Sequence, residues 1–410
     1  MKLATYRDGS RDGQLVVVSR DLSQACFATG IATRLQQVLD DWNFMAPQLE
    51  SLSQSLNQGR ARHAFSFDPR QCLAPLPRPA AWLAGEAYPA HGAELRERGV
   101  PVPERLSGPL IRMGGAETLL GPNDTPLLRG VPGLEPEPQL AVVLGDLPAD
   151  AVPSQALDAV RLLMAVNAWV LRPVQQEELA QGWPALHSRP ALQCAPVAIT
   201  PEELPGAWYL GRAALQIQMH RNGRKQPLLE TKEGMAWSFG DLIAEAARRR
   251  PLRAGTLVGA GMPAGAAPMT LKDGDSLRID FKMAEGGSPF GAIDMDLAES
   301  TATQDEGADA ADAGDASNVL DDARDARDAS EADERNATER EPHEGETSEG
   351  ETSDPGADAS DVTDPQADDR GVNQSDAVAV DPTAPGPAPK AAARPPRRKA
   401  GKPPAPEGDQ

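Results

Sequence analysis

Residues 134–145 read Leu-Glu-Pro-Glu-Pro-Gln-Leu-Ala-Val-Val-Leu-Gly, so polar residues lead directly into an apolar run. The run at 140–145 predicts a buried strand. Alternate residues of a strand point to the same face, and we expect Glu137 and Gln139 to aim their side chains at one point. Two carboxylates there would suit a hard divalent cation, but Gln139 offers only a neutral carbonyl oxygen. The stretch therefore predicts a polar centre with one carboxylate.

Short apolar runs of the same kind recur along the chain, at 73–79, 195–199, 215–219 and 277–281. Prolines and glycines separate them, a pattern of many short strands. Two helices are also predicted. One opens at Thr200 and must be brief because Pro205 follows, and the other spans 239–250, with Asp241 near its start and three arginines at its end. We predict an α+β fold that is mainly β.

The first 70 residues predict a small N-terminal domain. Apolar residues at 2–6 and 14–19 flank a turn rich in Asp and Gly, which indicates a hairpin. Apolar residues then recur at helical spacing from 31 to 42, and a second helical segment runs from Pro47 to Leu56. We place the first domain boundary near residue 70.

The negative charge of the chain is concentrated in residues 299–410. This segment holds 29 of the 61 acidic and 11 of the 40 basic residues, so it carries a net charge of −18 and the rest of the chain −3. Its composition buries too little apolar surface to offset the entropy of ordering, which predicts a disordered acidic tail with a basic C-terminal end. Two interpretations stay open: a solvating tail whose ends attract each other, or a docking arm for acidic polymers or membranes.

Composition also argues against several classes of protein. The three cysteines have no paired spacing, so neither a disulfide framework nor a zinc site is expected, and a cytoplasmic location fits best. The first residues lack the apolar segment of an export signal, and the most hydrophobic stretch, 159–171, is too short to span a membrane. The arginines at 248–250 have no aromatic or further basic residues around them in the sequence, so we expect no nucleic-acid partner.

A histidine and a carboxylate lie three residues apart in Tyr88-Pro-Ala-His91-Gly-Ala-Glu94. On a helical turn they share a face, which would let Glu94 orient His91 as a general base. Such a pair also occurs as a purely structural hydrogen-bonding unit. From spacing alone both interpretations remain.

Four motifs together resemble the fumarylacetoacetate hydrolase family in order and spacing. They are Tyr-x-x-His-x-x-Glu at 88–94, Glu-x-Gln at 137–139, Ser-Arg-Pro at 188–190 and Gly-Thr-Leu-Val-Gly-Ala-Gly at 255–261. The resemblance covers about residues 1–298, and its opening segments are similar to those of the longer bacterial members. It implies the family's mixed β-sheet fold over 71–298. Without the resemblance, the glycines need imply only tight turns, because a phosphate loop would require a Lys-Ser/Thr partner.

The resemblance implies a metal-dependent hydrolase that cleaves a carbon-carbon bond in small diketo acids such as fumarylacetoacetate and acylpyruvates. Mg²⁺ or Mn²⁺ would chelate adjacent oxygens of the substrate, and the pair that activates water would be His91 and Glu94. Tyr88 would lie beside this pair at the substrate. The resemblance also implies a homodimer.

Three of the four metal-binding carboxylates implied by the resemblance are missing here. The first, seven residues before His91, falls on Ala84. The paired glutamates fall on Glu137 and Gln139, and the last, expected after an apolar helix that ends in Val-Asn, falls on Ala168. One glutamate and one amide carbonyl should hold Mg²⁺ poorly.

Two further positions depart from the family pattern. The active-site lysine is Arg189, which keeps the positive charge but spreads it over a planar fork. The substrate-contacting threonine is Met262, which lacks the hydroxyl and adds bulk. We therefore predict a family member with a degenerate metal site and weak, altered or no hydrolase activity.

Two alternatives remain open from the sequence. A working hydrolase would recruit a cation through Glu137, Gln139, Glu135 and substrate oxygens, or would polarise a carbonyl with Arg189. A non-catalytic protein would use the pocket for a carboxylate ligand and the acidic tail for partners.

Overall fold

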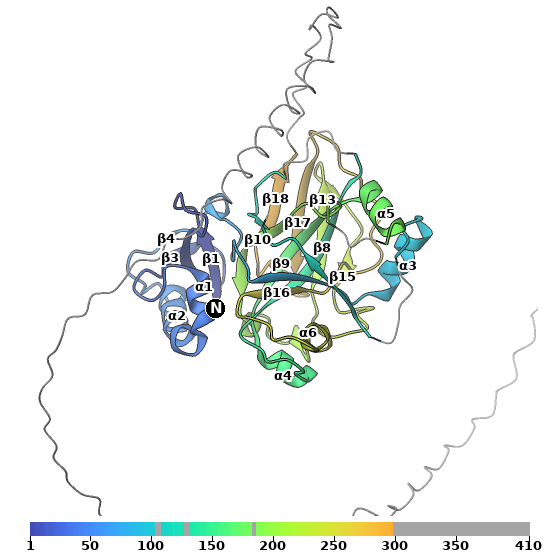
Figure 1. Ribbon diagram of the computed structural model, residues 1–410. Helices are drawn as coiled ribbons and strands as arrows, with labels where there is room; N and C mark the ends of the chain where they lie inside the picture. Colours follow the sequence, from blue (N-terminus) through green and yellow to red (C-terminus); the bar gives the residue numbers. More distant parts are fainter. Residues whose placement is uncertain (103–107, 118, 127–131, 183–185, 298–410) are drawn as a thin grey trace, which may run out of the picture. The chain divides into compact units, whose positions relative to one another are not determined.

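The computed structural model describes residues 1–102, 108–117, 119–126, 132–182 and 186–297 (Figure 1). Three β-sheets, one of them a single pair of short strands, and a few short helices make up this part of the chain, which confirms the predicted α+β fold that is mainly β. The predicted acidic tail at 299–410 lies outside the described residues. Within the described ranges no helix is both long and apolar enough to cross a membrane.

The larger sheet is mixed and has 11 strands, in the order β4-β3-β2-β1-β10-β9-β8-β16-β5-β6, with β7 paired to β10. The pairs β16–β5 and β7–β10 are parallel and the others antiparallel. The predicted N-terminal hairpin consists of β1 and β2, which pair antiparallel. Strand β1 also pairs with β10 and so joins the hairpin to the rest of the sheet. The strands are β1 (Lys2–Tyr6), β2 (Gln14–Val18), β3 (Gln24–Phe27), β4 (Phe65–Ser66), β5 (Ala81–Glu86), β6 (Leu110–Gly114), β7 (Leu119–Leu120), β8 (Leu134–Leu144), β9 (Val160–Leu171), β10 (Leu192–Ile199) and β16 (Thr256–Gly259).

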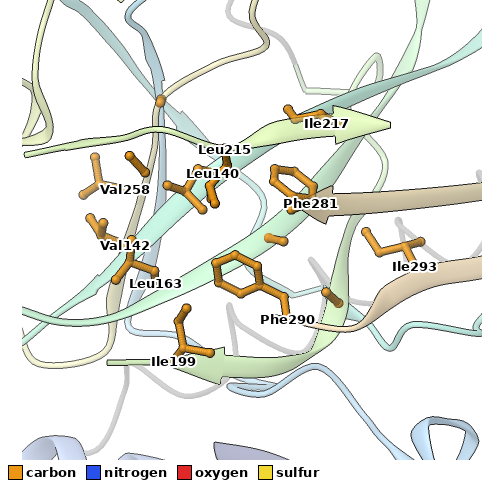
Figure 2. Close-up of a cluster of buried hydrophobic side chains, with 14 of the residues drawn as sticks. Leu140, Val142, Leu163, Ile199, Leu215, Ile217, Val258, Phe281, Phe290 and Ile293 are labelled. Carbon is orange, nitrogen blue, oxygen red and sulfur yellow. The ribbon is translucent and has the colours of Figure 1, made fainter. Parts of the chain in front are cut away.

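The smaller sheet covers one face of the larger one. Figure 2 shows Leu140 and Val142 of β8 and Leu163 of β9 in the same buried cluster as aromatic and aliphatic side chains from the smaller sheet. Its order is β14-β13-β17-β18, with β15 paired to β13. Its strands are β13 (Gln216–Arg221), β14 (Arg224–Lys225), β15 (Leu229–Glu230), β17 (Ser276–Lys282) and β18 (Ala292–Asp296). A separate two-stranded antiparallel sheet consists of β11 (Trp208–Tyr209) and β12 (Arg212–Ala213).

The opposite face of the larger sheet packs against the two predicted N-terminal helices. Leu35, Val38 and Leu49 of these helices share a second buried cluster with Ala141 and Val143 of β8. Even-numbered residues of β8 therefore face the smaller sheet and odd-numbered residues face away from it. The helices are α1 (Leu35–Asp40), α2 (Trp42–Asn57), α3 (Pro89–Glu97), α4 (Pro153–Asp158), α5 (Arg172–Ala180) and α6 (Phe239–Ala247), with single 3₁₀ turns at Pro69–Gln71 and Pro201–Glu203.

Strand β8 is longer than predicted and contains two prolines, Pro136 and Pro138. It pairs with β9 along its whole length but with β16 only near its C-terminal end. The carbonyls of Leu134 and Leu140 point away from β9, toward the amides of Leu271 and Ala260. Pro136 and Pro138 are also even-numbered, so their backbone nitrogens, which carry no hydrogen, point away from β9 as well. No strand pairs with β8 on that side at these residues, and a sheet tolerates proline at such a position.

Two local predictions were wrong. Residues 73–79 form no strand, and the apolar segment ending in Val166-Asn167 is strand β9 rather than a helix. Almost every residue of β9 is buried because the two clusters cover both of its faces. A strand buried on both faces reads as a continuous apolar run, and periodicity does not separate it from a buried helix.

Helix α6 begins at residue 239, as predicted, but ends three residues earlier than the predicted residue 250. The Ser238 hydroxyl accepts a hydrogen bond from the amide of Asp241, whose carboxylate accepts one in return from the Ser238 amide. This capping box satisfies two amides of the first turn. The helix ends at Ala247, so the three arginines at 248–250 follow it.

Asn167 supplies a test of the core. Its side chain is fully buried, and both amide atoms lack a hydrogen-bond partner among the described residues. Because an unpaired buried amide is costly, Asn167→Val should raise the free energy of unfolding in urea by about 1 kcal/mol. The matched control is Gln193→Leu, because the Gln193 amide bonds to the Trp169 indole and to loop carbonyls. We expect that control to lose roughly 1–3 kcal/mol. A loss of stability in Asn167→Val would mean that an ordered water satisfies the amide.

Candidate active site

The odd-numbered residues at the start of β8 carry the polar centre. Glu135, Glu137 and Gln139 are all buried on one face of the strand. The register of the sheet sets Ala168 of β9 opposite Glu137. Helix α3 follows β5 and helix α5 follows β9, so each adds side chains to the same region.

Glu137 contacts two arginines and lies near a histidine. Its Oε1 lies 2.9 Å from Arg172 Nη2 and 3.8 Å from His91 Nε2, and Arg189 Nη1 bonds to its Oε2. Burial alone would raise the pKa of this carboxyl, but the positive charge of Arg189, with the contributions of His91 and Arg172, holds it well below its usual value. Glu137 is therefore an anion whose charge is already compensated by side chains of this chain.

Arg172, which the sequence analysis did not single out, bridges the two buried glutamates. Its Nε donates to Glu135 Oε2 and its Nη2 to Glu137 Oε1, both at 2.9 Å, and its Nη1 donates to Gln175. The residue begins α5, where Pro173 in the first turn needs no hydrogen-bond donor. The only signal in the sequence was a basic residue directly after the apolar run of β9.

Arg98 completes the network from the end of α3. Its Nη2 donates to Glu135 Oε1, and its backbone carbonyl accepts a hydrogen bond of 3.4 Å from Gln176 of α5. The two helices that flank the centre are thus joined, and Figure 1 shows them side by side. Thr270 also donates to Glu135 Oε1 at 3.4 Å, which ties the segment before β17 to the same carboxylate.

Arg189 is held in place by a carboxylate that lies away from the centre. Glu178 of α5 accepts hydrogen bonds from the amides of Leu186, His187 and Ser188 and from the Ser188 hydroxyl. These bonds fix the segment just before Arg189. Helix α5 therefore positions both arginines that contact Glu137, one directly and one through Glu178.

Ala84, one of the positions where a metal carboxylate was expected, has an arginine as its neighbour. It lies on β5 and pairs with Arg112 of β6. Burial and the nearby charge of Arg189 lower the pKa of Arg112 to about 10. Arg112 thus adds a third guanidinium to the surroundings of Glu137, 3.5 Å from a carboxylate oxygen of Glu86.

His91 and Glu94 share a face of α3, as their spacing predicted, but they make no direct hydrogen bond. His91 Nδ1 lies 3.7 Å from Glu94 Oε2, while Glu94 Oε1 accepts a 2.9 Å hydrogen bond from the Gly265 amide. Both ring nitrogens of His91 are buried without a hydrogen-bond partner among the described residues. Burial lowers the pKa of His91, but attraction to Glu137 outweighs this effect and leaves the pKa above its ordinary value of 6.5.

The Gln139 side chain bonds to the glycine segment at 255–261 and not to a ligand shared with Glu137. Its Oε1 accepts a 2.9 Å hydrogen bond from the Gly261 amide. Gly261 has a φ of 81°, which favours glycine. Gly259 lies under the Trp82 ring and the Gln139 amide, where a Cβ would come within 2.4 Å of both. The glycines therefore have a local steric and conformational reason to be there.

A small cavity of about 30 Å³ adjoins the centre. His91, Arg98 and Arg172 line its polar side, and Met262 lies on its apolar side with two further methionines. The volume holds roughly two water molecules. Tyr88, predicted beside the substrate, donates its hydroxyl to the Thr231 carbonyl at 2.5 Å and does not line this cavity.

Comparison with known protein families agrees with the order of these motifs. Residues 1–78 match the family described as fumarylacetoacetase N-terminal domain 2, and residues 80–295 match fumarylacetoacetate (FAA) hydrolase C-terminal. The chain belongs to the fumarylacetoacetate hydrolase family. No curated protein matches it at a significant level.

Solved structures of the fumarylacetoacetate hydrolase family share its fold. The chain is similar to a fumarylacetoacetate hydrolase from the psychrophile Exiguobacterium antarcticum, with 20% identity, a TM-score of 0.54, and coverage of 73% of this chain and 99% of that one. It is also similar to maleylpyruvate hydrolase from Sphingobium sp. SYK-6 in complex with manganese(II) and pyruvate, with 19% identity and a TM-score of 0.53. That match covers 73% of this chain and 100% of the other.

The raised pKa of His91 predicts a pH-dependent stability for this family member. A group whose pKa is higher in the folded state binds its proton more tightly there, so its stabilisation is present below pH 6.5 and is lost as the pH rises through the folded-state value. The free energy of unfolding of the wild type, minus that of His91→Asn, should fall as the pH rises from 6 to 9, by at most roughly 1.4 kcal/mol per pH unit. Urea denaturation across this range measures the difference. A difference that grows with pH would mean that burial outweighs Glu137.

Proposed function

We propose that this protein has the fumarylacetoacetate hydrolase fold but no longer hydrolyses diketo acids by a metal-dependent route. The observation that carries the proposal is the state of Glu137. It is the one carboxylate left among the four expected metal positions, and Arg172 and Arg189 both bind it. Its negative charge is compensated without an added cation.

The residues present do not fit a hard divalent ion. Two of the expected ligand positions are the alanines Ala84 and Ala168, and Gln139 uses its carbonyl oxygen on the Gly261 amide. Mg²⁺ and Mn²⁺ prefer several carboxylate, carbonyl or water oxygens. Among the described residues, no group of three or more His, Cys, Asp or Glu side chains is arranged to hold a metal ion. A nearby guanidinium would also repel a divalent cation.

The size of the cavity supports the same conclusion. Small-molecule sites usually enclose about 300–1,000 Å³, whereas the space beside His91 is about 30 Å³. The bond from the Gly265 amide to Glu94 keeps the segment 263–269 over this space. A diketo acid would have to displace that segment before it reached the centre.

The first prediction of this proposal concerns metal and substrate together. Added Mn²⁺ or Mg²⁺ should leave the melting temperature of the full chain unchanged, because Glu137 already has two guanidinium partners. Metal analysis by plasma emission should find no stoichiometric divalent ion, and acetylpyruvate should be hydrolysed no faster than in buffer. Metal-dependent hydrolysis that disappears in His91→Ala would contradict the proposal.

A second candidate function is hydrolysis without a metal. Arg189 keeps a buried Nε with no hydrogen-bond partner, and His91 has both ring nitrogens unpartnered beside the same carboxylate. Such groups are able to polarise a carbonyl and to accept a proton from water. Acetylpyruvate hydrolysis that persists in EDTA and is lost in both His91→Ala and Arg189→Met would favour this function over the first.

A reversal experiment tests why the metal route is closed. Carboxylates introduced by Ala84→Asp, Gln139→Glu and Ala168→Asp should pair with the arginines already present, so this triple variant should still not bind Mn²⁺. Adding Arg172→Ala and Arg189→Lys should open the centre and give saturable binding by isothermal titration calorimetry. Equal Mn²⁺ binding by the triple variant alone would mean that the arginines do not block the site.

A further inference from the structure

We propose that the tip of the β13–β14 hairpin is a binding site for a small organic dianion, whose charge comes from two carboxylates or from a phosphoryl group. The anionic oxygens bind between Arg221 and Arg224, which line a cleft on the outer side of the segment 263–269. The inference goes beyond the proposed function and does not depend on it, because neither arginine contacts the carboxylates of the centre around Glu137.

The hairpin holds its two arginines directly opposite each other. The two residues of its turn, Asn222 and Gly223, have φ of 50° and 72°, and positive φ at both positions is typical of a tight type I′ turn. The register of the strands pairs Arg221 with Arg224. Like charges that face each other across an antiparallel pair are destabilising. An anion bound between the two guanidinium groups removes this repulsion.

Asp275 fixes the turn but compensates only one of the two positive charges. Its buried carboxylate accepts hydrogen bonds from Arg221 Nη2 at 2.6 Å and from Asn222 Nδ2 at 2.7 Å. Asn222 Oδ1 in turn accepts one from the Ser276 amide at 2.8 Å. Arg224 is exposed, and its side chain has no hydrogen bond or ion pair with any described residue. One guanidinium of a rigidly held pair is therefore available to a ligand.

The space beside this pair is large enough for a small molecule. The cleft has a volume of about 540 Å³, and small-molecule sites usually enclose about 300–1,000 Å³. The described residues that line it include two arginines and two amides but no carboxylate; they are Arg221, Asn222, Arg224, Gln226, Pro268 and Met269. Guanidinium groups bind carboxylate and phosphate oxygens with charge-assisted hydrogen bonds. Pro268 and Met269 give the carbon skeleton of the ligand an apolar wall.

The same apolar wall separates the cleft from the candidate active site. Pro268 and Met269 also line the small cavity beside His91. A ligand in the outer cleft therefore contacts the segment 263–269, which lies over the centre, and should oppose its displacement.

The test is thermal melting of the full chain in sodium phosphate, sodium succinate and sodium acetate at equal ionic strength. Phosphate, succinate or both should raise the melting temperature with saturation, by roughly 3 °C at ten times the dissociation constant. Acetate carries one charge and should give no saturable rise. A response to phosphate alone would assign a phosphoryl ligand, and a response to succinate alone a dicarboxylate. The absence of a saturable response to both would overturn the proposal.

Two matched variants separate a site at the hairpin from general effects of the salts. Arg224→Gln removes the guanidinium that has no carboxylate partner, so the saturable rise should disappear. Arg249→Gln removes another exposed arginine, which follows α6, and should keep the full response. Equal responses in the two variants would mean that the anions act through exclusion from the protein surface or at another place, which contradicts the site.

A charge reversal tests the repulsion between the two arginines. Arg224→Glu replaces a like-charge pair across the hairpin by an opposite-charge pair. In chloride buffer without dianions this variant should melt higher than the wild type, by roughly 1–2 °C, and should show no response to phosphate or succinate. A variant that melts below the wild type, or that still responds to the dianions, would overturn the proposal.

Hydrogen exchange measured by mass spectrometry locates the ligand independently of melting. The dianion that stabilises the wild type should slow exchange in the segment 263–269, and it should leave exchange in Arg224→Gln unchanged. Unchanged exchange in the wild type would place the ligand away from Pro268 and Met269 and contradict the site. None of these measurements uses hydrolysis, so metal-dependent activity would overturn the proposed function without affecting this inference.

Discussion

The buried guanidinium of Arg172 between Glu135 and Glu137 is the interaction on which this centre depends. Charges removed from water are costly unless each has a partner with good geometry, and here three guanidinium groups and two carboxylates form ion pairs with one another. The pairing also has a structural consequence. It joins the start of β8 to α5 directly and to α3 through Arg98, so both helices are held at the same end of the larger sheet.

Strand β8 explains how such a charged centre coexists with a dense apolar core. Its even-numbered residues, such as Leu140 and Val142, pack toward the smaller sheet (Figure 2). Its odd-numbered residues begin as Glu135 and Glu137 and end as apolar side chains under the N-terminal helices. Polar and apolar side chains are therefore separated on β8 in two ways: they lie on opposite faces at its start, and polar residues give way to apolar ones along its odd-numbered face. A shift of register by one residue would exchange the two faces.

The sequence was informative where the pattern is local. The start of α6 close to Asp241 and the placing of His91 and Glu94 on one helix both follow from residues a few positions apart. It was uninformative where the partner is distant. Strand β9 is buried on both faces, so its apolar run carries no period, and Arg172 gains its role only because β9 lies beside β8 and brings residue 172 within reach of residues 135 and 137.

Under the proposed function, the arginines around Glu137 and the alanines at positions 84 and 168 have one electrostatic explanation. Glu135 and Glu137 are two buried anions, and the arginine that pairs with both of them compensates their charge. Arg112, which pairs in register with Ala84, and Arg172, four residues after Ala168, lie near two of the positions where the resemblance implies metal carboxylates. Introducing one carboxylate at a time at these positions would therefore strengthen the arginine network rather than create a metal site, because each new anion would meet a cation already in place.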